Sequence, residues 1–164
     1  MKKYLMSMAA LLIMSAMLFV GESSKKTSQA FYDYKSQVIG TELDGSYTIR
    51  AWGRARNKID AYQQARKTAV YDVIFNGVES ANSSIDPLKP LLLEVNAKEK
   101  YEDYFNKFFR DNGDFEKYVS LKEKRIGSTK YKKTDTQTMA QVTLCVYRSE
   151  LKAKLKEDGI LKTK

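Results

Sequence analysis

Basic and aromatic side chains alternate along one stretch near the C-terminal end of the chain. Tyr118 and Tyr131 lie among six basic residues of a predicted strand and its turn. These cations are Lys122, Lys124, Arg125, Lys130, Lys132 and Lys133. Cations interleaved with aromatic rings on a strand bind single-stranded nucleic acid or glycan. Lysines also protect an exposed edge strand against aggregation, and the interruptions by Glu123 and Asp135 favour this second interpretation.

Arg66 is the other candidate for a functional cation. It projects close to the apolar face of a predicted helix over residues 58–75, about 40° from the centre of that face. The pattern favours an arginine that extends its charged end to the rim of the helix. The alternative is a buried cation paired with a carboxylate or a ligand.

Catalytic and metal-binding signatures are missing from the sequence. The chain has no histidine, which removes the usual general base, the Ser-His-Asp arrangement and most zinc sites. Glu102 and Asp103 are adjacent and diverge on a helix, so they make a poor acid–base pair. Gly53-Arg54-Ala55 lacks the further glycines of a phosphate-binding loop, and we interpret Gly53 as permitting a sharp strand-to-helix turn. We therefore expect no enzyme activity, no cofactor and no metal.

The N-terminal residues indicate export. Lys2 and Lys3 precede an apolar run over residues 4–20, and small residues follow it, which is typical of a secretory signal over residues 1–23. The run is just long enough to stay in a membrane as an uncleaved anchor instead. We predict a protein of the periplasm or cell envelope, which is membrane-associated if the anchor is retained. A polar tether over residues 24–37 would then lead into a single domain over residues 38–164.

Net charge limits the class of partner. The chain has 29 Lys and Arg against 20 Asp and Glu, a formal net charge of +9. A basic surface favours polyanions such as lipid head groups, acidic glycans or nucleic acid, although such a charge also serves solubility alone. The single cysteine, Cys145, cannot form an internal disulfide, so stability must come from packing.

Local patterns predict where the helices and strands lie. A hairpin over residues 38–52 turns at Asp44-Gly45. A helix over 58–75 follows, capped by Asn57, with alanines at i, i+4 spacing that allow close approach to a sheet. Residues 78–96 are irregular.

The C-terminal half is predicted to contain two helices with a hairpin between them. Asn96 caps a second helix, whose aromatic stripe has the spacing of a core face: Tyr101, Tyr104, Phe105, Phe108 and Phe109. Strands over 118–132 and 137–148 form a second hairpin, and Ser149 caps a last helix. The order predicts an α/β (α+β) fold, a two-layer sandwich with a four-stranded, mainly antiparallel sheet covered on one face by helices.

The first strand and helix also carry a family resemblance. The sequence from Tyr47 to Ala55 ends in Gly-Arg-Ala and leads to a helix lined by Ala61, Ala65 and Ala69. This pattern resembles the LPP-twenty type of small outer-membrane lipoprotein and is similar to the N-terminal domain of flagellar assembly protein T. The resemblance implies a non-enzymatic envelope module with an envelope protein or a membrane-associated partner. The chain lacks the lipid-bearing cysteine of such lipoproteins after its apolar run.

Overall fold

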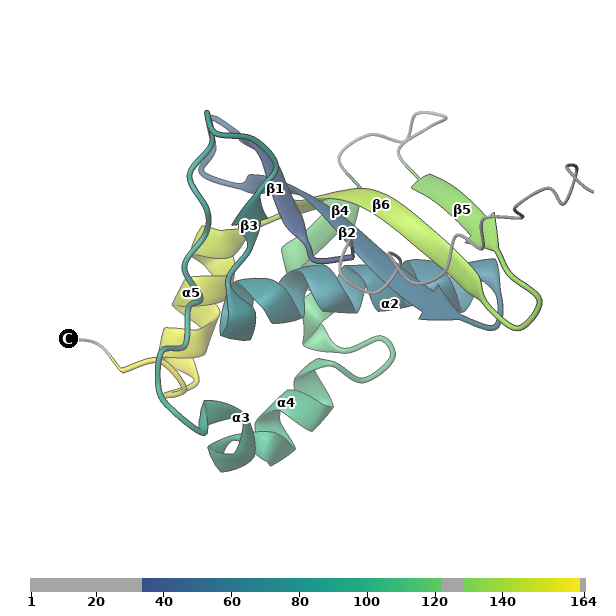
Figure 1. The fold of residues 1–164 in the computed structure, drawn as a ribbon. Coiled ribbons are helices and arrows are strands. Elements are labelled where there is room, and N and C mark those ends of the chain that lie inside the picture. Colours follow the sequence, from purple (N-terminus) through teal and green to yellow (C-terminus); the bar gives the residue numbers. More distant parts are fainter. Residues whose placement is uncertain (1–33, 122–128, 163–164) are drawn as a thin grey trace, which may run out of the picture. The chain divides into compact units, whose positions relative to one another are not determined.

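A mixed sheet of six strands forms the centre of the described part of the chain (Figure 1). The computed structural model describes residues 34–121 and 129–162, which belong to one compact unit, Tyr32–Lys164. The strands are β1 (Gln37–Thr41), β2 (Tyr47–Ala55), β3 (Glu79–Ser80), β4 (Val119–Leu121), β5 (Thr129–Lys133) and β6 (Thr138–Val146). Their order is β3-β1-β2-β6-β4, and β5 also pairs with β6. In these described ranges, no helix has the length and apolar character needed to cross a membrane.

The sheet differs from the predicted four-stranded, mainly antiparallel one. The two-residue strand β3 pairs in parallel with β1, which makes the sheet mixed. Such a short strand has no alternation of its own, and for that reason the prediction assigned it to the irregular stretch. Ser36 and Gln37, which the sequence assigns to the tether, already belong to the folded unit, because Ser36 is buried and Gln37 pairs with Arg50.

The predicted strand over residues 118–132 is two strands. Both β4 and β5 pair antiparallel with β6, Leu121 lying opposite Leu144 and Thr129 opposite Val142. Only Thr143 separates those two positions on β6, so β4 and β5 cannot be one continuous strand. This segment, like the predicted signal over residues 1–23, lies outside the described residues.

The hairpin of β1 and β2 is confirmed, but its turn is longer than predicted. Thr41 pairs with Tyr47, so residues 42–46 form the loop in place of a two-residue turn. The carboxylate of Asp44 accepts bonds from the backbone N–H and the hydroxyl of Ser46 at 2.9 and 2.6 Å. Gly45 has a φ of +79°, a conformation that glycine adopts without strain. Asp44 and Gly45 therefore form the turn as predicted, but the loop around them is wider than two residues.

Helix α2 (Lys58–Tyr71) packs closely against β2. Asn57 caps it as predicted, accepting a bond of 2.9 Å from the backbone N–H of Asp60. The three helix residues that face the sheet are fully buried: Ala61, Ala65 and Ala69. Ile59 has the spacing of the apolar face in the sequence and was predicted to belong to it, but its side chain is 74% exposed.

Gly53 is the residue that permits this packing. A Cβ atom on it would lie 2.1 Å from the carbonyl oxygen of Ala61 and 2.3 Å from the backbone nitrogen of Ala65. Strand β2 continues through Gly53 to Ala55, which corrects the prediction that Gly53 makes a strand-to-helix turn. Its function in the fold is to let the helix backbone approach the strand.

The remaining helical segments complete the core. They are the π-helix η2 (Asp72–Asn76), α3 (Ala97–Lys100), α4 (Glu102–Phe108), the 3-10 helix η3 (Asp114–Tyr118) and α5 (Arg148–Glu157). Phe105 and Phe108 are 5% and 3% exposed, so the aromatic stripe is core as predicted. Asn96 is the N-cap residue of α3 as predicted, but its side chain makes no capping bond. The predicted cap at Ser149 is wrong, because Ser149 lies inside α5 and Tyr147 is the N-cap residue.

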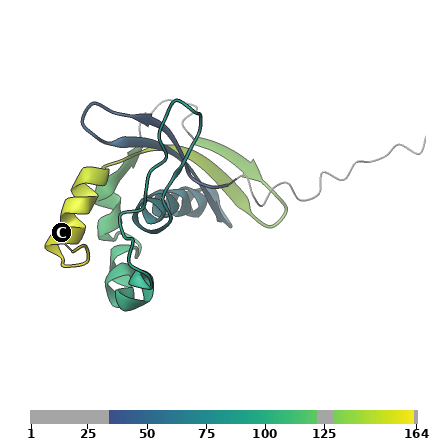
Figure 2. The same ribbon diagram turned by 60° about the vertical axis from the view of Figure 1, so that its left-hand side comes forward.

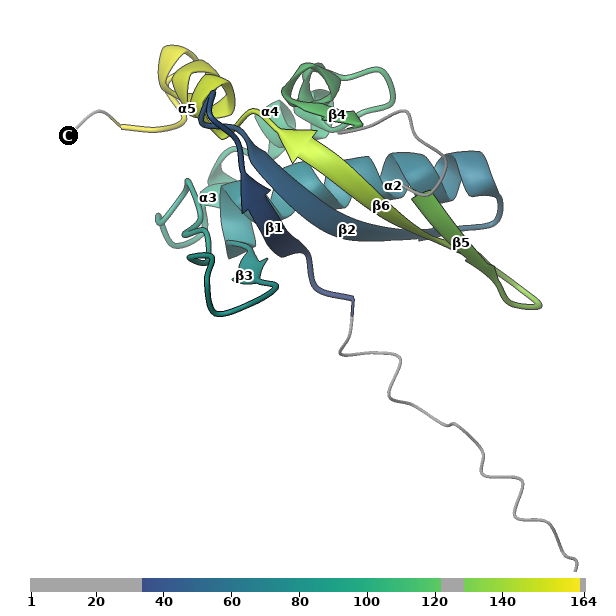
Figure 3. The ribbon, with the colours of Figure 1, turned by 90° about the horizontal axis from the view of Figure 1, so that it is seen from above.

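Helices α2, α4 and α5 lie on one side of the sheet. Figure 2 shows α2 end-on beneath the strands, with α4 further below and α5 beside them. The inward-facing residues of β6 are fully buried, as their alternation predicts: Ala140, Val142, Leu144 and Val146. Figure 3 looks onto the opposite face of the sheet, with α2 behind the strands.

We expect Gly53→Ala to lower the free energy of unfolding by about 3 kcal/mol, because the new methyl group would overlap backbone atoms of α2. Chemical denaturation of the purified protein measures this loss. Gly40→Ala is the matched control, since a Cβ there would lie at an ordinary 3.7 Å from Cβ of Thr48, and it should change stability by less than about 1 kcal/mol. Equal losses for both variants would contradict close packing at Gly53.

Candidate functional site

The sheet face that turns away from α2 gathers cations. Residues of β6 alternate between fully buried positions and half-exposed ones, and cross-strand partners share a face. The side chains that point away from the helix on β2, β5 and β6 form what we call the outer face. They are Thr48, Arg50, Trp52, Arg54, Lys130, Lys132, Met139, Gln141, Thr143 and Cys145. Four of these ten residues are cations and none is acidic, while at one end of the face the hydroxyl of Thr48 donates to the carboxylate of Glu42 at 2.6 Å.

The strand register arranges the outer face in rows. One row consists of Trp52, Gln141 and Lys130, in that order across the sheet. The next consists of Arg54, Met139 and Lys132. Neighbouring strands lie about 5 Å apart, so a cation of β5 lies about 10 Å from its row partner on β2. An uncharged side chain of β6 separates the basic groups of β2 from those of β5.

Tyr34 extends the outer face with a second aromatic ring. Its ring lies 6.2 Å from that of Trp52, and the two planes meet at 63°. The guanidinium of Arg54 lies over the Tyr34 ring at 4.7 Å from its centre, within cation–π range. Arg50 donates a hydrogen bond of 3.4 Å to the side-chain oxygen of Gln37 on β1. Two rings and two guanidinium groups therefore lie together at the centre of this face.

The structure divides the predicted basic cluster. Lys130 and Lys132 point to the outer face, whereas Lys133 pairs with Thr138 and belongs to the other face. Lys122, Lys124 and Arg125 lie outside the described residues. Among the described strands β5 pairs only with β6, and its three lysines are exposed, an arrangement that also fits protection of an edge strand.

Three cationic or aromatic residues of the outer face were missed from the sequence. Arg50, Trp52 and Arg54 recur at every second position of β2, which is the signal that could have identified them. The prediction ended this strand near Gly53, and for that reason Arg54 was not assigned to the same face.

Arg66 is a half-buried cation between α2 and η3. Its side chain is 13% exposed, and its Nη1 lies 3.7 Å from Oε1 of Glu116. The same Nη1 donates to Oε1 of Gln63 at 2.9 Å, and Nη2 donates to the carbonyl of Val119 at 3.5 Å. The side chain is thus half-buried and lies beside a carboxylate, as the second interpretation requires.

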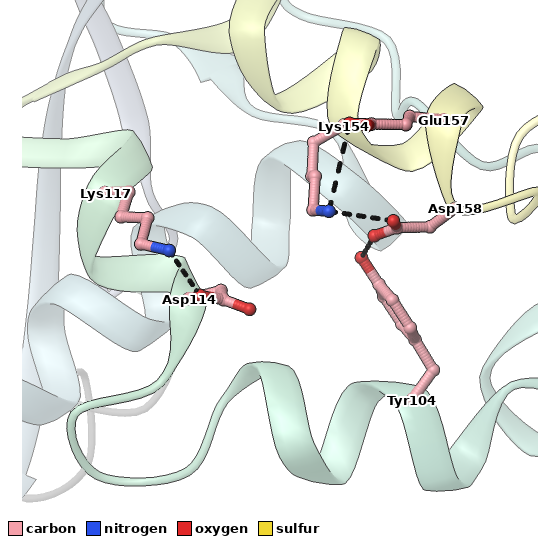
Figure 4. Close-up of polar contacts among 6 residues, drawn as sticks. All are labelled: Tyr104, Asp114, Lys117, Lys154, Glu157 and Asp158. Atoms are coloured by element: carbon pink, nitrogen blue, oxygen red, sulfur yellow. Dashed lines mark hydrogen bonds and ion pairs between the residues drawn. The ribbon is translucent and has the colours of Figure 1, made fainter.

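A second group of titratable side chains joins α4 to α5 (Figure 4). The hydroxyl of Tyr104 donates to Asp158 at 2.6 Å, and the ammonium of Lys154 donates to the same carboxylate at 2.8 Å. Burial, and then the bond to Asp158, raise the pKa of Tyr104 well above its usual value. Burial raises the pKa of Asp158, but the bonds from Lys154 and Tyr104 outweigh it, so that this pKa is lowered. These pairs hold α5 against α4.

Other hollows and acidic groups give no defined ligand chemistry. A groove of about 660 Å³ lies between α2, η2 and the α3–α4 segment, with Tyr71, Phe75 and Phe109 on its wall. Its rim carries both signs of charge, Lys98 beside Glu99 among them. Within the described ranges, no three His, Cys, Asp or Glu residues are grouped so as to hold a metal ion.

Comparison of the chain with protein-family models, with curated proteins and with solved structures found no match. The resemblance to small envelope lipoproteins and to flagellar assembly protein T therefore stays a prediction.

We expect Tyr104→Phe to lower the free energy of unfolding by about 1 kcal/mol at neutral pH, since Asp158 loses a hydrogen-bond donor. The raised pKa of Tyr104 makes this contribution depend on pH. It is fully present below the unfolded pKa near 10 and is lost as the pH rises above it. Denaturation of both proteins across the alkaline range measures the difference, which should shrink above about pH 10.

Tyr131→Phe is the control for this series, because Tyr131 is 43% exposed and no hydrogen bond of its hydroxyl is seen. It should leave stability unchanged at every pH. A Tyr104→Phe loss that stays constant through the alkaline range would contradict the raised pKa of Tyr104.

Proposed function

We propose that this protein is an exported, non-catalytic binding module that holds an anionic polymer on the outer face of its sheet. The observation that carries the proposal is the register of β2, β6 and β5. It brings Arg50, Arg54, Lys130 and Lys132 to one face, with no carboxylate among the ten residues of that face. A surface of one charge sign attracts an extended chain of the opposite sign.

The types of these cations suit phosphate, sulfate or carboxylate groups. A guanidinium presents a planar fork of donors that matches an anionic group with two oxygens, whereas an ammonium acts as a point charge. The face has guanidinium groups on β2 and ammonium groups on β5. The sequence predicted two kinds of partner, an envelope protein and a polyanion. The outer face suits a polyanion directly, whereas an envelope protein would bind this face only through an acidic segment.

Protection of an edge strand is compatible with this proposal. Among the described strands β5 pairs only with β6, so the backbone groups on its other edge have no partner strand there. Lysines beside such an edge discourage pairing with another chain. The ammonium groups of Lys130 and Lys132 point to the outer face and are available to a ligand at the same time. The two functions differ in what happens when these charges are removed.

We expect Lys130→Gln/Lys132→Gln to weaken binding to inorganic polyphosphate and to reduce its salt dependence. Each lost contact should lower the slope of log affinity against log salt by about 0.7–0.9, so the slope should fall by about 1.4–1.8. Titration of the ligand at several salt concentrations measures this. Lys133→Gln/Lys107→Gln removes the same charge away from the outer face and should leave the slope unchanged.

Light scattering on the same variants separates the alternatives. A Lys130→Gln/Lys132→Gln variant that self-associates but binds polyphosphate as before would support edge protection alone and contradict the proposed function. Equal weakening in both double variants would also contradict it, because only net charge would then matter.

The location outside the cytoplasm is proposed from the signal over residues 1–23 and from the envelope resemblance. We expect the intact mass of the protein from its native host to correspond to an N-terminus between Gly21 and Lys25. A full-length mass in the membrane fraction would instead support a retained anchor. A full-length mass in the cytoplasm would contradict export.

A further inference from the structure

We propose that the anionic polymer is a single-stranded nucleic acid, one base of which stacks on Trp52. This inference rests on the proposed function and adds the class of ligand. Trp52 is the only tryptophan of the chain, and it is half-buried at the centre of the outer face. Single strands are held by stacking of their bases on aromatic rings, combined with cations that follow the backbone.

The cations lie on three sides of Trp52. Arg50 and Arg54 are each two residues away on the same face of β2, about 7 Å along the strand in either direction. Lys130 shares the row of Trp52, across the intervening Gln141, about 10 Å away. A base on the ring would therefore have cations near the phosphates that precede and follow it.

Tyr34 adds a second stacking surface. Its ring meets that of Trp52 at 63°, so the two rings form a corner in place of a parallel stack. The guanidinium of Arg54 covers the Tyr34 ring at 4.7 Å. Aromatic rings and guanidinium planes are both surfaces on which unstacked bases lie.

The polar groups of the outer face favour a nucleic acid over a glycan or a membrane. The face offers few groups of the kind that bind sugar hydroxyls. Its ten residues include one amide, Gln141, and the neighbouring Gln37 and Glu42 already accept bonds from Arg50 and Thr48. A tryptophan that anchors a protein at a bilayer reaches into the headgroup layer. Trp52 is half-buried and has cations on the same face around it.

Fluorescence of the single tryptophan tests this directly. The protein as purified is titrated with oligothymidylate and with inorganic polyphosphate, which has the charges without the bases. We expect oligothymidylate to quench Trp52 and to bind more tightly than polyphosphate at equal salt and equal charge.

Anisotropy of a labelled oligothymidylate then measures the variants. Trp52→Leu should weaken oligothymidylate binding by about tenfold or more, and by a much larger factor than it weakens polyphosphate binding. Trp52→Phe keeps a ring and should retain most of the affinity, which controls for folding together with a thermal melt of each variant.

The outcomes distinguish this inference from the proposed function. Equal affinity for the two ligands, with no effect of Trp52→Leu, would overturn the stacked base and leave polyanion binding standing. Binding to anionic phosphatidylglycerol vesicles without binding to oligothymidylate would overturn it in favour of a lipid surface. Failure of both polyphosphate and oligothymidylate to bind would overturn the inference and the proposed function together.

Discussion

The close contact between Gly53 and the backbone of α2 is the constraint on which the rest of this structure depends. Atoms of the helix backbone occupy the space that a side chain at Gly53 would need. The small buried alanines at 61, 65 and 69 let the helix pack closely against the sheet. Strand β2 therefore continues without a break beneath the helix to Ala55. It pairs with β6 over its full length, from Tyr47 opposite Val146 to Ala55 opposite Thr138.

This pairing fixes the direction of every second side chain. With one face of β2 and β6 against α2, the alternate residues must point away from it, and a shift of register by one residue would turn the cations into the core. The backbones of β2 and β5 lie about 10 Å apart, which exceeds the screening length of about 8 Å at physiological salt. Their mutual repulsion is thus weak in the free protein, while a polymer that spans both strands would contact both sets.

The sequence predicted elements with a strong local pattern. The alternation of β6, the alanine spacing and cap of α2, and the buried Phe105 and Phe108 all have such a pattern, and the structure confirms them. Elements that depend on partners far along the chain were not predicted. The pairing of Glu79–Ser80 with β1, and the division of the second hairpin into β4 and β5, follow from cross-strand register. The candidate site was only partly found for the same reason, because Lys130 and Lys132 meet Arg50 and Arg54 through the intervening strand β6.

The central claim is that the outer face, and not the groove beside α4, is the surface that meets a ligand. Two-dimensional NMR of the labelled protein during addition of inorganic polyphosphate tests it most directly. The account predicts shift changes that concentrate at Arg50, Trp52, Arg54 and on β5, and that decrease with added salt. Changes concentrated at the groove residues Tyr71, Phe75 and Phe109, with the outer face unaffected, would contradict it.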